Sequence, residues 1–157
     1  MTDACHRSGT WSRTSVTMCR WFLGAAYLYM GVVKALHPVE FLKLIRQYDL
    51  LHNATALDCV AAWLPWFEIA CGVFLLAGVT VRGAALVSLT MLIPFTTAVL
   101  HRALAIKSLL AISFCAVKFD CGCGTGEEFI CRKLVENVLL IAMSAWLLAK
   151  PVRTYAV

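Results

Sequence analysis

The chain has 157 residues, of which 61% are hydrophobic and only 15% charged, and its formal net charge is +5. A soluble domain contains roughly 45–50% apolar and about 25% charged residues, so this apolar excess is too large for one soluble core. The basic residues form no stripe typical of nucleic-acid binding, and basic residues at helix ends are ordinary in membrane proteins. The composition therefore predicts a single membrane domain over residues 1–157, which contacts the lipid bilayer and no nucleic acid.

The first apolar segment covers about residues 18–36 and follows a basic tail, residues 1–17, which we expect to be frayed and cytoplasmic. A membrane-spanning helix needs about 20 mostly apolar residues. Because the charge-free part of this segment is short, we expect Arg20 and Lys34 to extend their charged groups to the two interfaces. A cleaved signal peptide is the alternative, but Val33-Lys34-Ala35 is not a small-x-small cleavage site.

The residues after His37-Pro38 have a different pattern from the first span. Large apolar residues recur at helical spacing over residues 39–51, with Glu40, Lys43 and Arg46 among the charged residues between them. This pattern predicts an amphipathic helix that lies on the membrane surface.

Three further apolar segments cover about residues 59–81, 84–104 and 134–149. Pro94 lies inside the third span and predicts a kink there. The segment 108–117 is too short to span, and we interpret it as re-entrant, interfacial or an extension of the third helix. We therefore expect an all-α, four-transmembrane-helix bundle over residues 18–150. The amphipathic helix would lie between spans 1 and 2, and a cysteine-rich loop between spans 3 and 4.

The orientation of the bundle follows from its basic residues. Arg82 lies in the very short turn that we expect between the second and third spans, around residues 80–83. Short loops rich in Lys and Arg favour the cytoplasm. We therefore expect both termini in the cytoplasm and the cysteine-rich loop on the periplasmic or exterior side.

Four of the eight cysteines cluster in the third loop, at Cys115, Cys121, Cys123 and Cys131, beside three glycines. A bridge between Cys121 and Cys123 closes a small strained ring, which makes it easily reduced and suited to redox exchange. Lys118 is one of the basic residues that would favour the thiolate, although acidic neighbours oppose it. We predict Cys121 and Cys123 as the catalytic pair, and Cys115 and Cys131 as resolving or structural cysteines.

Other interpretations of this cluster stay open. The cysteines are also compatible with structural disulfides that close the loop, or with plain packing. Thiolates would suit zinc or copper(I), but the spacing is not the usual pair of Cys-x2-Cys knuckles, and we assign no metal ligand. Cys19, Cys59 and Cys71 lie in or at the ends of spans, where cysteine behaves as a small hydrophobic residue.

Polar residues at membrane depth form a second candidate group. Glu68 lies near the middle of the second span, where an ionisable side chain is costly and suggests a function. Equally, Glu68 is a candidate structural partner for Lys34 or a hydrogen-bonding group inside the bundle. Glu136 and Asn137 open the fourth span and are expected either to cap it or to line the bundle interior.

Four motifs resemble those of MauE/DoxX-like membrane proteins, in the same order, over about residues 18–150. They are Gly31-Val32-Val33-Lys34-Ala35-Leu36-His37-Pro38, Leu64-Pro65-Trp66-Phe67-Glu68-Ile69-Ala70-Cys71-Gly72, Asp120-Cys121-Gly122-Cys123-Gly124 and Leu134-Val135-Glu136-Asn137. Two features depart from the family pattern. Many members read Cys-Gly-Cys-Phe-Gly, whereas here Gly124 follows Cys123 and is itself followed by Thr125 and Gly126. In addition, a longer loop adds Cys115 and Cys131.

The resemblance implies a membrane bundle associated with redox maturation of exported proteins. Its methylamine-utilisation branch is linked to the disulfide-rich small subunit of methylamine dehydrogenase and a thioredoxin-like partner. Its DoxX branch is linked to thiosulfate:quinone oxidoreductase, which makes a quinone a candidate cofactor.

We therefore expect a bacterial inner-membrane protein in which Cys121 and Cys123 exchange electrons with a periplasmic thioredoxin-like protein or a disulfide-rich client, as a thiol–disulfide oxidoreductase would. Lys118, Glu68, Lys34 and Asn137 would support this pair. One alternative is a non-enzymatic assembly or maturation factor whose cysteines only staple the loop. The other is a metal-binding or transport protein.

Overall fold

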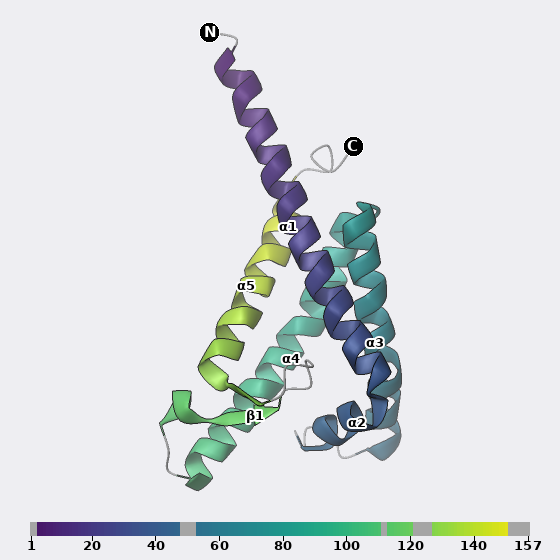
Figure 1. Cartoon of the computed structure of the whole chain (residues 1–157), viewed down its shortest axis with the longest axis vertical. Helices are drawn as coiled ribbons and strands as arrows, with labels where there is room; N and C mark the ends of the chain where they lie inside the picture. Colours follow the sequence, from purple (N-terminus) through teal and green to yellow (C-terminus); the bar gives the residue numbers. More distant parts are fainter. Residues whose placement is uncertain (1–2, 48–52, 111–112, 121–126, 151–157) are drawn as a thin grey trace.

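A computed structural model gives the fold and describes residues 3–47, 53–110, 113–120 and 127–150 (Figure 1). The elements, in chain order, are α1 (Asp3–Leu36), α2 (Pro38–Gln47), α3 (Ala54–Ala77), α4 (Val81–Leu110), the 3-10 turn η1 (Phe114–Ala116), β1 (Lys118–Asp120), β2 (Glu127–Phe129) and α5 (Ile130–Ala149). α1 packs chiefly on α3 and α4 chiefly on α5, while contacts between α3 and α4 and between α1 and α5 complete a ring.

Three helices of the described chain are long and apolar enough to cross a membrane. The stretches concerned are Arg13–Leu36, Thr55–Ala77 and Val81–Leu109. Large side chains such as Trp21, Trp63 and Trp66 are exposed on them, as expected of a surface that meets lipid. These helices confirm an all-α, multi-pass membrane protein. α5 is as apolar as α4 along most of its length, but its first two turns carry three charged residues, Arg132, Lys133 and Glu136.

The N-terminal helix is longer than the sequence suggested. α1 is helical from Asp3, so residues 3–17 are not the frayed tail that we expected. Extending an existing helix adds about one hydrogen bond per residue fixed, whereas only a new helix must be nucleated at a cost. No proline interrupts these residues, and the helix continues past the other helices at one end of the molecule (Figure 1).

The turn between α3 and α4 lies earlier than predicted. Gly78 ends α3 in the left-handed region, with a φ of 75°, which a glycine adopts without strain. Gly83, which we had placed in the turn, lies inside α4. The guanidinium of Arg20 packs against Gly78 in this turn, where Arg20 is buried by protein, and its expected position at a membrane interface stays a prediction. The partial negative charge at the C-terminus of α3 favours a cation at this position.

The far end of α4 carries the small hairpin. α4 continues to Leu110, so residues 108–110 extend the third helix, one of our three interpretations of the segment 108–117. β1 pairs with β2 antiparallel, and α5 begins at Ile130, four residues before the predicted start. The segment that we predicted as a cysteine-rich loop before residue 134 therefore contains two short strands and the first turn of α5. Val117 and Ile130 are fully buried against Val99 and Ala103 of α4, and this apolar cluster holds the hairpin on the helix.

α1 and α3 run antiparallel and approach closely where both carry glycine (Figure 1). A Cβ atom at Gly72 would lie 2.7 Å from the backbone nitrogen of Leu28 and 2.9 Å from the carbonyl oxygen of Gly24. Backbone atoms cannot move aside as a flexible side chain can. Small residues at a helix contact allow such close approach inside a membrane, and here they bring Lys34 and Glu68 within reach of each other.

We predict that Gly72→Ala destabilises the protein, because the added methyl group forces α1 and α3 apart. Overpacking of this kind costs about 1–3 kcal/mol. The matched control is Gly83→Ala, since a Cβ there meets only the Cβ of Thr80 at 3.9 Å. Alanine inside a helix is favoured over glycine by roughly 0.5–1 kcal/mol, so the control should be neutral or stabilising. Thermal unfolding in detergent measures both. Equal effects of the two variants would contradict the close packing.

Candidate functional site

The centre of the helix ring holds a buried ion pair. The ammonium nitrogen of Lys34 on α1 lies 2.5 Å from Oε1 of Glu68 on α3, and the two side chains are only 2% and 9% exposed. Taking an unpaired charge into a low-dielectric interior costs several kcal/mol, so each group depends on the other. The pairing confirms the interpretation of Glu68 as the partner of Lys34. The prediction that Lys34 reaches the interface is wrong, because Glu68 satisfies it inside.

Aromatic rings from two other helices complete the surroundings of Lys34. Its ammonium lies 5.3 Å from the ring centroid of Phe41 on α2 and 5.5 Å from that of Phe95 on α4. At such distances the negative faces of aromatic rings attract a cation. Phe41 is buried, so α2 packs its apolar side on this site.

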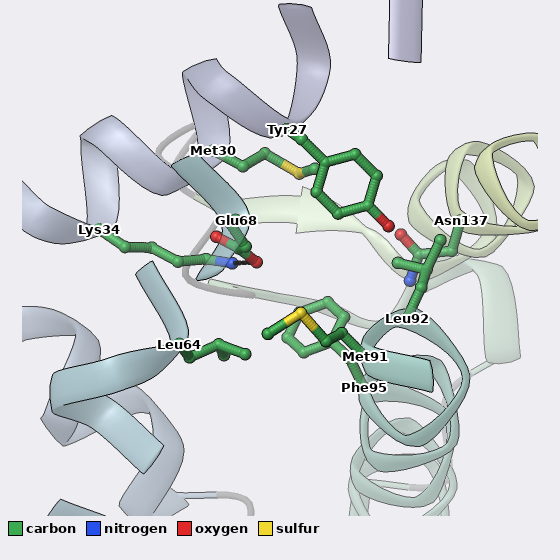
Figure 2. Close-up of a pocket in the computed structure, with 9 residues that line it drawn as sticks. All are labelled: Tyr27, Met30, Lys34, Leu64, Glu68, Met91, Leu92, Phe95 and Asn137. Carbon is green, nitrogen blue, oxygen red and sulfur yellow. Dashed lines mark hydrogen bonds and ion pairs between the residues drawn. The ribbon is translucent and has the colours of Figure 1, made fainter. Parts of the chain in front are cut away.

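α5 contributes an amide to the same centre. Asn137 is 2% exposed and lines a cavity together with Tyr27, Glu68 and Phe95 (Figure 2). Because α5 begins at Ile130, Asn137 lies well inside the helix. Of the two roles expected for this residue, lining the interior is confirmed and capping the helix is wrong. The hydroxyl of Tyr27 donates to the backbone carbonyl of Ser88 on α4, at 3.1 Å, and so fixes α1 against α4.

Charged residues of α5 lie between this centre and the hairpin. The ammonium of Lys133 lies 3.4 Å from Oε2 of Glu136, whose other oxygen accepts from the guanidinium of Arg132 at 3.1 Å. Lys133 is buried, and its charge lies within electrostatic reach of Glu68. The polar centre therefore extends along α5 towards the end of the ring that carries the hairpin.

A disulfide joins the two ends of the hairpin region. Cys115 in η1 is bonded to Cys131 in the first turn of α5, and their Cα atoms are 5.1 Å apart. The N–H of Ile130 also donates to the carbonyl oxygen of Val117 at 3.1 Å. The disulfide and this hydrogen bond close the base of the hairpin, where β1 leaves and β2 returns.

The predicted catalytic cysteines lie outside the described residues. Cys121 and Cys123 fall in the stretch 121–126, which connects β1 to β2. The ammonium of Lys118 lies 4.3 Å from the ring centroid of Phe129 on the neighbouring strand, and its role beside the cysteine pair stays a prediction. Among the residues that the structure describes, no group of three or more His, Cys, Asp or Glu side chains gathers as metal ligands would.

Sequence reasoning missed several residues of the polar centre. Tyr27, Met30 and Lys34 all line the cavity, and they recur on α1 at intervals of three and four residues. This spacing places them on one helix face, and it is the signal that would have grouped Tyr27 with Lys34. Lys133 lies before the predicted start of the fourth span, so the sequence did not reveal that it belongs to α5 and is buried there.

Long apolar helices with an ion pair enclosed between them define this chain as a multi-pass membrane protein. The chain belongs to the MauE family, since the family model described as methylamine utilisation protein MauE matches residues 12–150. This match confirms the MauE resemblance, while the relation to DoxX stays a prediction. Comparison with curated proteins and with solved structures gave no match.

We predict that Glu68→Leu destabilises the protein by about 3–5 kcal/mol, because it leaves the buried Lys34 charge without a partner. The double variant Lys34→Met/Glu68→Leu should recover most of this loss, since apolar residues can replace a buried pair. Glu40→Gln on α2, whose side chain is 75% exposed, is the control and should be nearly neutral. Thermal unfolding in nanodiscs measures all three. A double variant as unstable as the single one would contradict this account.

We predict that Cys115→Ser lowers the free energy of unfolding by about 3 kcal/mol, as expected for a bridge that closes a loop of roughly 15 residues. The two cysteines are 16 residues apart. Alkylation followed by mass spectrometry should also find Cys131 newly reactive in this variant. Cys59→Ser removes an exposed free cysteine and serves as the control. Alkylation of Cys131 in the unreduced parent protein would exclude the disulfide.

Proposed function

We propose that this MauE-family protein carries out thiol–disulfide exchange with exported proteins at the bacterial inner membrane, through Cys121 and Cys123. The observation that carries the proposal is the disulfide between Cys115 and Cys131 at the base of the hairpin. Disulfides persist in oxidising compartments such as the periplasm. The Cys115–Cys131 disulfide therefore supports a loop on the extracytoplasmic side of the membrane. The Cys-x-Cys sequence lies in the same loop, where exported proteins can reach it.

The strand register supports a hairpin tip that carries the reactive pair. Asp120 pairs with Glu127, the last pair before the connection. Cys121 follows β1 directly in the chain, and Cys123 comes two residues later. The disulfide and the apolar cluster of Val117 and Ile130 hold the two strands at the end of α4 and α5.

The helix arrangement supports four crossings with both termini in the cytoplasm. α1 starts and α5 ends at one end of the molecule, and the hairpin and α2 lie at the other (Figure 1). α5 has 20 residues and is therefore about 30 Å long, the thickness of the hydrocarbon core. Its charged first turns would then lie near the periplasmic interface, beside an interfacial α2.

The exchange conserves electrons between the two partners. The Cys121 thiolate attacks one sulfur of a partner disulfide, forms a mixed disulfide and releases the partner's other sulfur as a thiolate. The Cys123 thiolate then attacks the sulfur of Cys121, which frees the reduced partner and leaves Cys121 and Cys123 joined. Two electrons pass to the partner, and the reverse sequence oxidises it. The partner is a thioredoxin-like protein or a disulfide-rich client, as the MauE family suggests.

A quinone does not fit the central cavity as it stands. The cavity measures about 20 Å³, which is room for a water molecule, whereas ligand pockets typically measure about 300–1,000 Å³. We therefore derive no step through a quinone. In this proposal Lys34, Glu68 and Asn137 have a structural role. They stabilise the packing of the helices, and α4 and α5 carry the hairpin.

We predict that Cys123→Ser captures the exported partner as a mixed disulfide through Cys121. Cells are quenched with acid, free thiols are blocked, and adducts are compared on gels with and without reductant before mass spectrometry. The double variant Cys121→Ser/Cys123→Ser is the matched control and should capture nothing. Cys59→Ser should behave as the parent protein.

Two results would reject this proposal. Thiol trapping that finds Cys121 and Cys123 in one unchanging state, together with unimpaired growth on methylamine of both serine variants, would favour an assembly factor whose disulfide is structural. Stoichiometric metal in the purified protein would instead favour metal binding or transport.

A further inference from the structure

The cavity at the centre of the ring contains two buried polar atoms with no apparent use. Oε1 of Glu68 accepts a hydrogen bond from the ammonium of Lys34, which leaves Oε2 of the same carboxylate. Neither Oε2 of Glu68 nor Nδ2 of Asn137 has a hydrogen-bond partner within the part of the chain that the structure describes. Glu68 is only 7% exposed and Asn137 only 2%. A buried polar atom left unsatisfied costs about 1–3 kcal/mol, so two in one cavity point to a shared ligand.

The size of the cavity limits what this ligand is. About 20 Å³ accommodates a single water molecule, which needs two to four polar neighbours. Glu68 accepts a hydrogen bond from such a molecule and Asn137 donates one to it, so a ligand with both capacities satisfies both atoms. If the Asn137 amide is turned over, its oxygen accepts instead, and water can still donate to both groups. An anion would be repelled by the carboxylate.

We propose that one internal water molecule occupies this cavity and bridges the Glu68 carboxylate on α3 to the Asn137 amide on α5. The hydroxyl oxygen of Tyr27, which lies on the same side of the cavity as Asn137 (Figure 2), can accept a further hydrogen bond. This inference does not rest on the proposed exchange at Cys121 and Cys123.

The bridge would join the two halves of the fold. α1 packs chiefly on α3, and α4 chiefly on α5, so direct contacts hold each pair together better than they hold the pairs to each other. The water would connect the Lys34–Glu68 pair of the first half to α5 of the second. Asn137 follows Cys131 by six residues, about 9 Å along the helix. The bridge would therefore help to position the helix that anchors the hairpin.

X-ray radiolysis of water tests this directly, because hydroxyl radicals formed inside a protein oxidise the residues next to a bound water. Met30 and Met91 line the cavity, and Met143 on α5 does not, although all three are half-buried. In the parent protein in nanodiscs, a short exposure should oxidise Met30 and Met91 several-fold faster than Met143. Equal rates at the three methionines would overturn the proposal without any variant.

Asn137→Leu provides the second arm, since it removes the amide and fills the site with apolar atoms. Oxidation of Met30 and Met91 should fall to the rate of Met143, which stays unchanged. If this variant folds, as judged by the intact Cys115–Cys131 disulfide, and the two methionines still react fast, Asn137 does not hold the water. Val138→Leu, at an exposed neighbour on α5, is the matched control and should preserve the parent pattern.

Discussion

The buried ion pair between Lys34 and Glu68 is the constraint on which the other helices depend. Each charge is tolerable inside the ring only while the other is within reach, so α1 and α3 must keep one depth and one rotation relative to each other. Glycines at the contact provide the close approach that this requires. Phe41 and Phe95 then pack on the ammonium from α2 and α4, so one pair organises side chains from four helices.

The apolar spans could be predicted from the sequence because the bilayer imposes a length and a composition that a single chain reveals. The pairing of Lys34 with Glu68 was only one of several interpretations of the sequence, since the two residues are 34 positions apart and only the packing of α1 on α3 brings them together. The hairpin was missed for another reason. Strands of three residues are too short for an alternating pattern, and their apolar residues lie beside charged ones.

In the candidate sites, too, residue types could be recognised from the local sequence, whereas contacts between residues far apart in the chain could not be predicted. A cluster of four cysteines was evident, but four cysteines allow three pairings, and spacing alone did not select Cys115 with Cys131. Glu68 and Asn137 were recognised because polar groups are rare at membrane depth. Tyr27 was not, because an aromatic residue in an apolar span looks ordinary until its hydroxyl is seen to bond across helices. The chemistry of Cys121 and Cys123 stays a prediction.

The polarity of α5 has a consequence for how the protein is made. Arg132, Lys133 and Glu136 lie in its first two turns, and Asn137 follows them in the helix. An isolated α5 would expose these polar side chains to lipid at one end. Lys133 and Asn137 are buried only because the earlier helices surround them. If α5 crosses the membrane as proposed, Lys133 and Asn137 are removed from lipid only once the earlier helices surround them, so the burial of these two residues and the closure of the ring are a single event.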